Sequence, residues 1–88
     1  MMLDELLNQE VVIDMSSTFV CIGTVTRFDD QFIELKHADV HDLRDTETSR
    51  ENYVVESKTT GIKRNRRRVL IVRKEIVAIA LLRDVVDT

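Results

Sequence analysis

The chain has 88 residues, of which 43% are hydrophobic and 33% charged, and its net charge is −3 at pH 7. This length predicts a single domain, 1–88, and the composition is typical of a soluble globular protein. No apolar run approaches the roughly 18 residues of a membrane-spanning helix. The acidic N-terminus also lacks the basic and apolar regions of a secretory signal, so we expect a cytoplasmic protein without a membrane partner.

The N-terminal segment changes its hydrophobic period at Glu10. Leu3, Leu6 and Leu7 recur at helical spacing with acidic residues between them, which predicts a short amphipathic helix over 2–9. From Glu10 onward apolar and polar residues alternate, and this pattern predicts a first strand over 10–15.

The next two predicted strands form an antiparallel pair. The run Phe19–Phe28 is rich in β-branched and aromatic residues but contains Gly23 near its middle. A glycine inside a strand marks a sharp bend or a close approach of two backbones, because it has no Cβ. The third strand is predicted over 31–40, across a tight turn at Asp29-Asp30. We therefore expect Gly23 to relieve crowding where the second strand bends.

The second half of the chain begins with a long polar insertion over 41–68. It contains an apolar fragment at 53–55 and a turn signal at Thr60-Gly61, and it predicts a connection with either a strand extension or a short helix. Strands over 69–72 and 76–82 follow. The expected fold is mainly β: a short N-terminal helix, then a strongly bent five-stranded antiparallel small barrel, whose closure would remove its exposed edges.

Residue types that carry chemistry are sparse. Cys21 lies in an apolar run and is expected to be a buried thiol. His37, Asp39 and His41 alternate on what would be one strand face, but such a triplet is a weak metal signal, and we expect solvated side chains and no cofactor. The sequence contains no nucleophile–base pair, paired catalytic carboxylates or glycine-rich phosphate loop, so we do not expect an enzyme.

Two stretches resemble the motifs of a known family. Ile22–Asp29, IGTVTRFD, followed by an apolar strand, resembles the first motif of the Sm and Sm-like family, which includes bacterial Hfq, and 69–79, VLIVRKEIVAI, is similar to the second. The resemblance covers about 3–40 and 69–82. It implies a bent five-stranded barrel whose fourth and fifth strands pair between subunits, giving a homo-oligomeric ring of roughly five to seven subunits. It also implies single-stranded RNA as the partner and a role as an RNA chaperone or regulator.

The resemblance further implies which residues contact RNA. In the family, the turn after the second strand and the turn between the fourth and fifth strands face the central opening. The corresponding residues here are Asp29, Asp30, Gln31, Phe32, Arg73 and Lys74. The asparagine and the Arg-Gly pair that many members carry are missing. The alternative is therefore an oligomeric structural or protein-interaction module that has lost RNA binding.

A run of positive charge, KRNRRR at 63–68, precedes the second motif. Residues 1–61 carry a net charge of −8 and residues 62–88 one of +5. The run would bind RNA phosphates as a secondary contact, or it would pair with acidic residues of 42–56 in the same or a neighbouring subunit. The basic residues of this predicted patch are Lys63, Arg64, Arg66, Arg67 and Arg68.

Overall fold

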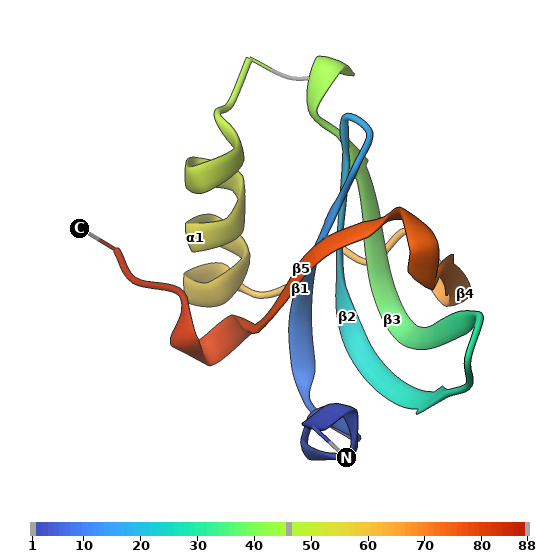
Figure 1. Cartoon of the computed structure of the whole chain (residues 1–88). Coiled ribbons are helices and arrows are strands. Elements are labelled where there is room, and N and C mark those ends of the chain that lie inside the picture. The colour runs from blue at the N-terminus through green and yellow to red at the C-terminus, as the bar shows by residue number, and fades with distance from the viewer. Residues whose placement is uncertain (1, 46, 88) are drawn as a thin grey trace.

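The computed structural model describes residues 2–45 and 47–87. Its regular elements are five strands, one α-helix and four short 3-10 helices (Figure 1). The strands are β1 Glu10–Met15, β2 Phe19–Phe28, β3 Phe32–Asp42, β4 Arg66–Val72 and β5 Ile76–Leu81. The helices are η1 Met2–Leu6, η2 Leu43–Asp45, α1 Arg50–Thr60, η3 Arg73–Glu75 and η4 Leu82–Asp84. Among the described residues, no helix is both long and apolar enough to cross a membrane.

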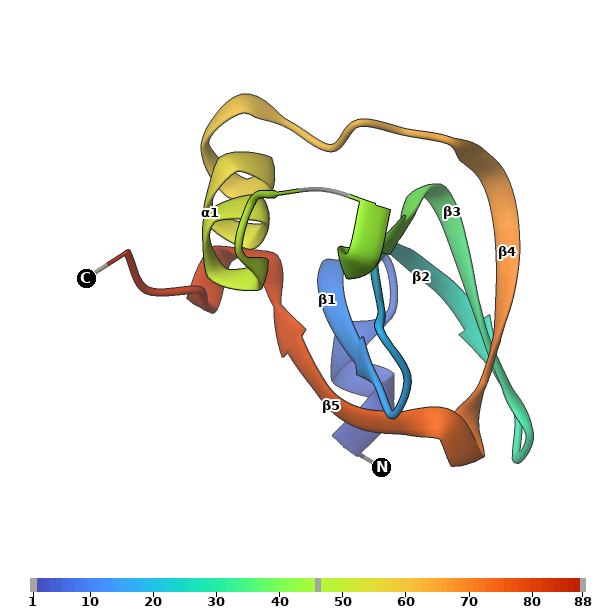
Figure 2. The same cartoon turned by 90° about the horizontal axis from the view of Figure 1, so that it is seen from above.

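The five strands form one antiparallel sheet in the order β4-β3-β2-β1-β5. The predicted mainly β fold with five antiparallel strands is therefore confirmed. The sheet is strongly curved, and Figure 2 shows it wrapping around a central space. Closure is not confirmed, because β4 and β5 occupy the two edges and do not pair with each other in the described part of the chain. The chain turns sharply at η3, so the two strands diverge from it and leave both edges open (Figure 2).

Gly23 lies where β2 and β3 approach most closely. The register of the two strands shifts between Ile22 and Thr24, at the position of this glycine. A Cβ at Gly23 would lie 2.9 Å from Ala38 Cβ and 3.2 Å from Leu35 Cβ, both of which belong to fully buried residues. The glycine thus permits the close packing that the bend requires, as expected from the sequence.

Two apolar clusters lie on opposite faces of the sheet, because side chains alternate along each strand. The concave face buries the main core, which consists of Val11, Ile13, Cys21, Val25, Ile33, Leu35, Ala38 and Ile71. The other face is covered by α1, and the cluster there consists of Val12, Val20, Ile22, Tyr53, Val54 and Leu82. Cys21 is 2% exposed, which confirms the predicted buried thiol, and this burial raises the pKa of the thiol to about 11.

The N-terminal helix is shorter and of a different type than predicted. The structure has a 3-10 helix, Met2–Leu6, in place of an amphipathic helix over 2–9. The chain leaves the helical conformation at Asn8, whose φ is 63°. There the Asn8 N–H donates to the Val25 carbonyl at 2.7 Å, and the Val25 N–H donates to the Gln9 carbonyl at 3.0 Å. Hydrogen bonds to β2 therefore replace those that would extend the helix.

The insertion over 41–68 contains both structures that the sequence left open. β3 extends to Asp42, and α1 follows with Ser49 as its N-cap and Gly61, at φ 99°, as its C-cap. β4 begins at Arg66 rather than at the predicted position 69, because Arg66 and Arg68 pair with residues of β3. Part of the basic run is consequently strand rather than loop.

The predicted common face of His37, Asp39 and His41 is wrong. A bulge between β2 and β3 interrupts the alternation, and His37 adopts φ 51° and is exposed. Asp39 is buried and accepts a hydrogen bond from the Tyr53 hydroxyl of α1. The ring of His41 stacks on Tyr53 with centroids 4.1 Å apart. Asp39 and His41 therefore hold α1 against the sheet.

Candidate nucleic-acid interface

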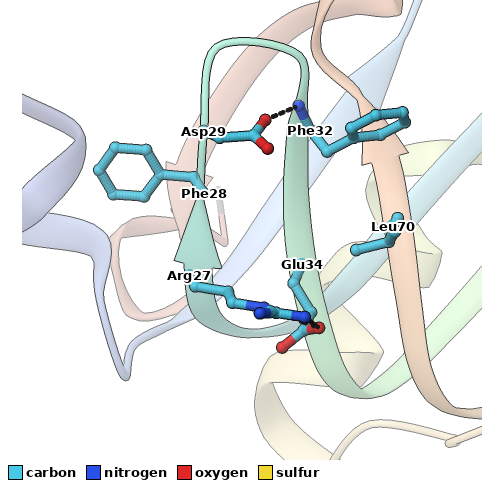
Figure 3. A pocket seen from close by; sticks show the side chains of 6 residues that line it. All are labelled: Arg27, Phe28, Asp29, Phe32, Glu34 and Leu70. Carbon is cyan, nitrogen blue, oxygen red and sulfur yellow. Dashed lines mark hydrogen bonds and ion pairs between the residues drawn. The ribbon is translucent and has the colours of Figure 1, made fainter.

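Asp29 shapes the turn between β2 and β3. Its Oδ1 accepts hydrogen bonds from the backbone N–H groups of Gln31 and Phe32, each at 2.8 Å, and its own N–H donates to the Phe32 carbonyl at 3.0 Å (Figure 3). The two bonds from Gln31 and Phe32 hold the pKa of the Asp29 carboxyl below its usual range. The Asp29 carboxylate thus stabilises the turn through hydrogen bonds to its backbone, while the neighbouring Asp30 and Gln31 are exposed.

Arg73 joins this turn to η3. Its backbone N–H donates to the Gln31 carbonyl at 2.8 Å, and its guanidinium donates to the Asp29 carbonyl. On the other side of η3, Ser16 donates its hydroxyl to the Glu75 carboxylate at 2.6 Å and its N–H to the Glu75 carbonyl at 2.8 Å. Two segments that lie far apart in the sequence therefore form one continuous surface.

The residues predicted to contact RNA gather around a hollow of about 320 Å³. Its lining consists of Asp30, Gln31, Phe32, Val72 and Lys74. Lys74 forms no ion pair within residues 2–45 and 47–87, and it shares the hollow with the carboxylate of Asp30. Phe32 also lines a second hollow, of about 310 Å³, and Figure 3 shows the side chains around it, which are Arg27, Phe28, Asp29, Phe32, Glu34 and Leu70. Asp29 and Arg73 support the first hollow without lining it.

The buried carboxylate of Glu34, which lines the second hollow, is a feature that sequence reasoning missed. Glu34 on β3 is only 4% exposed. It accepts a hydrogen bond from the Thr26 hydroxyl at 2.6 Å, one from Arg27 Nε at 3.2 Å, and one from Arg68. These three residues lower the pKa of Glu34 from 4.5 to about 2, Thr26 contributing most. Its partners come from β2 and β4, so they depend on the register of these strands with β3.

We expect the stability contributed by Glu34 to be lost in acid. Because its folded pKa is depressed, this stability is fully present above pH 4.5 and disappears as the pH falls toward about 2. Glu34→Gln should therefore be less stable than the wild type at neutral pH, and the difference should shrink through this window. Urea denaturation at several pH values measures it, with Glu47→Gln, which removes an exposed carboxylate, as the control. A difference that is constant with pH would contradict the assignment.

The structure divides the predicted secondary patch. Lys63 forms an ion pair with Glu56 at 3.3 Å, as the pairing with 42–56 anticipated, and Arg68 pairs with Glu34. The other three arginines line a hollow of about 260 Å³ near the start of β4. The residues around it are His37, Arg64, Asn65, Arg66 and Arg67.

Comparison with known proteins identifies the fold. No family model matches the chain, and a search of curated proteins finds no match. Among solved structures, the chain is similar to the Sm protein of Pyrococcus abyssii, which was solved in complex with a uridine heptamer. The two share 12% sequence identity, with a TM-score of 0.62 over 91% of this chain and 92% of the Sm protein. The chain therefore has an Sm-like fold, and the narrower likeness to Hfq stays a prediction.

Proposed function

We propose that this chain is an RNA-binding protein that assembles into a homo-oligomeric ring and holds single-stranded RNA on the surface formed by the β2–β3 turn and η3. It would act by binding rather than by catalysis, as a chaperone or regulator of RNA. The observation that carries the proposal is the link made by Arg73, which brings Phe32 and Lys74 to one hollow. The Sm protein of similar fold that was solved with a uridine heptamer supports the same ligand class.

The hollow offers the groups that single-stranded RNA requires. Phe32 presents an aromatic ring, and an aromatic face stacks on any base with a contribution of about 1 to 3 kcal/mol. Lys74 supplies a positive charge for a phosphate group. The exposed side chains of Asp30 and Gln31 offer hydrogen-bonding groups for base edges.

The open sheet edges support assembly. β4 and β5 each leave one side without a strand partner, and unprotected edges of this kind pair with other strands. Leu70, Val72 and Val77 on these strands are apolar and yet 44%, 38% and 69% exposed. Pairing of β4 with β5 of the next copy would join chains head to tail, and a closed head-to-tail arrangement is a ring. Each subunit would then add one Lys74 to a shared surface.

RNA binding by the Lys74→Ala variant tests the proposed surface. We expect this change to weaken binding of a short uridine-rich RNA severalfold and to flatten its salt dependence, because one phosphate contact per subunit is lost. Fluorescence anisotropy across a salt series measures both effects. The matched control is Arg83→Ala, which removes an exposed charge from η4. Arg73→Ala is less informative, because Arg73 also holds the β2–β3 turn.

Two results would contradict this proposal. Equal effects of Lys74→Ala and Arg83→Ala would place the RNA elsewhere on the protein. If the wild type binds no RNA even at low salt, the protein-interaction module becomes the better explanation of the fold.

A further inference from the structure

We propose that the hollow beside the start of β4, lined by His37 and by the segment 64–67, binds phosphate groups of single-stranded RNA as a second site. The inference rests on the proposed function and extends it from the turn surface to the other end of β4. Of the five basic residues predicted for the secondary patch, three belong to this site: Arg64, Arg66 and Arg67. His37 and Asn65 complete its lining.

The positive charge of this hollow is not neutralised within the subunit. Arg64, Arg66 and Arg67 are exposed, and no ion pair is recorded for them in the part of the chain that the structure describes. The described residues that line the hollow include no carboxylate. Arg66 does donate to the Asn65 carbonyl at 3.0 Å, but a guanidinium has five N–H donors and keeps others for a ligand. Three guanidinium groups that form no ion pair in the described part of the chain surround one hollow, and such groups suit phosphate oxygens.

Asn65 holds this segment in place. Its side chain accepts from the Val40 N–H and donates to the Val40 carbonyl, both at 2.9 Å. Its backbone N–H donates to the Ala38 carbonyl at 2.9 Å. These bonds continue the pairing of β3 with β4 beyond Arg66. The backbone that carries Arg64 and Arg66 is therefore fixed before a ligand arrives, which lowers the entropy cost of binding.

His37 completes the hollow from β3. It has φ 51° at the bulge opposite Gly23, a conformation that few residues other than glycine adopt. Strained backbone of this kind is concentrated at ligand sites. The exposed imidazole lies beside the arginines and adds a hydrogen-bond donor to them.

The position of the hollow predicts which RNA reaches it. β4 has seven residues, so its two ends lie roughly 20 Å apart. Lys74 follows one end, and the arginine hollow lies at the other. A short RNA on the turn surface would leave the hollow empty, whereas a longer strand would occupy both.

The test compares uridine RNAs of about six and about 20 nucleotides. The first length lies near the lower end of the roughly 4 to 16 nucleotides that one single-strand-binding fold occupies, and the second exceeds that range. We expect Arg64→Gln with Arg67→Gln to weaken binding of the long RNA about tenfold at low salt, and to reduce the slope of log affinity against log salt by about 1 to 1.5. Affinity for the short RNA should not change. The control is Lys63→Gln with Arg83→Gln, which also removes two positive charges. Neither residue lines the hollow: Lys63 is paired with Glu56, and Arg83 lies on η4.

A further variant separates the geometry of the site from its charge. Asn65→Ala keeps every arginine but removes the side-chain bonds to Val40. It should also weaken binding of the long RNA, and thermal melting would verify that the fold persists.

Two outcomes would contradict the inference, and they differ in what they say about the proposed function. If the arginine variant behaves like the control while Lys74→Ala still weakens the short RNA, this second site is wrong and the proposed function stands. If the wild type binds neither RNA, both are wrong.

Discussion

Gly23→Val should destabilise the protein by about 3 kcal/mol, at the upper end of the cost of overpacking a core. A Cβ at this position would lie 2.9 Å from Ala38 Cβ, 3.1 Å from Ala38 Cα and 3.2 Å from Leu35 Cβ. One of these contacts is with backbone, and both neighbours are fully buried, so a small rotation of a side chain cannot relieve the clash. The free energy of unfolding from urea titration, at one protein concentration, measures the loss.

Two further variants make this prediction specific to the crowding at Gly23. Thr24→Val places the same side chain at the next position of β2, where it should change the free energy of unfolding far less. Gly23→Ala should also be destabilising, and adding Ala38→Gly should recover part of the loss by removing the nearest atom. If Gly23→Val and Thr24→Val unfold alike, the bend of β2 does not depend on the missing Cβ.

Leu70→Lys combined with Val77→Lys should reduce the assembly to single chains. Leu70 lies on β4 and Val77 on β5, the two open edges of the sheet. If β4 of one copy pairs with β5 of the next, lysines on both strands bring like charges together across the new interface. Lysine on an edge strand also protects it from pairing. Light scattering coupled to size exclusion measures the mass, which should fall from several subunits to one.

The matched control is Met2→Lys with Val86→Lys. These residues are 83% and 71% exposed, comparable to Val77 at 69%, and neither lies in a strand. The control should keep the mass of the wild type. A wild type that is a single chain at micromolar concentration would overturn the proposed ring, and an unchanged mass of the edge variant would mean that assembly uses another surface.

The strands were predictable because their signal is local. Val11 and Ile13 alternate with polar or oppositely facing neighbours, and Phe19–Phe28 is rich in β-branched residues, so each segment favours extended backbone by itself. The bend at Gly23 was also predictable from local sequence, because a glycine inside a strand marks a bend or a close approach of two backbones. In the structure this alternation places Val11 and Ile13 together in the concave core.

The helices were predicted less well, because tertiary contacts decide them. Residues 2–9 have helical periodicity, yet the hydrogen bonds that join Asn8 and Gln9 to Val25 end the helix early. α1 exposes most of its side chains and buries only Tyr53, Val54 and Ser57, too few for a clear periodic signal. It is held through the bond from Tyr53 to Asp39, which no local pattern reveals.

The mainly β class and the bend at Gly23 could be predicted from the residues alone, and the resemblance indicated the two turns of the candidate site. The contacts of Arg73 between these turns, the ion pair of Glu34 with Arg68 and the arginines that form no ion pair in the described part of the chain became visible only in the folded domain. Arg73 and Arg68 bind acceptors 44 and 34 residues away along the chain. Such pairs depend on strand register and on how far the sheet curves, and both emerge from the packing of the whole domain rather than from any one segment.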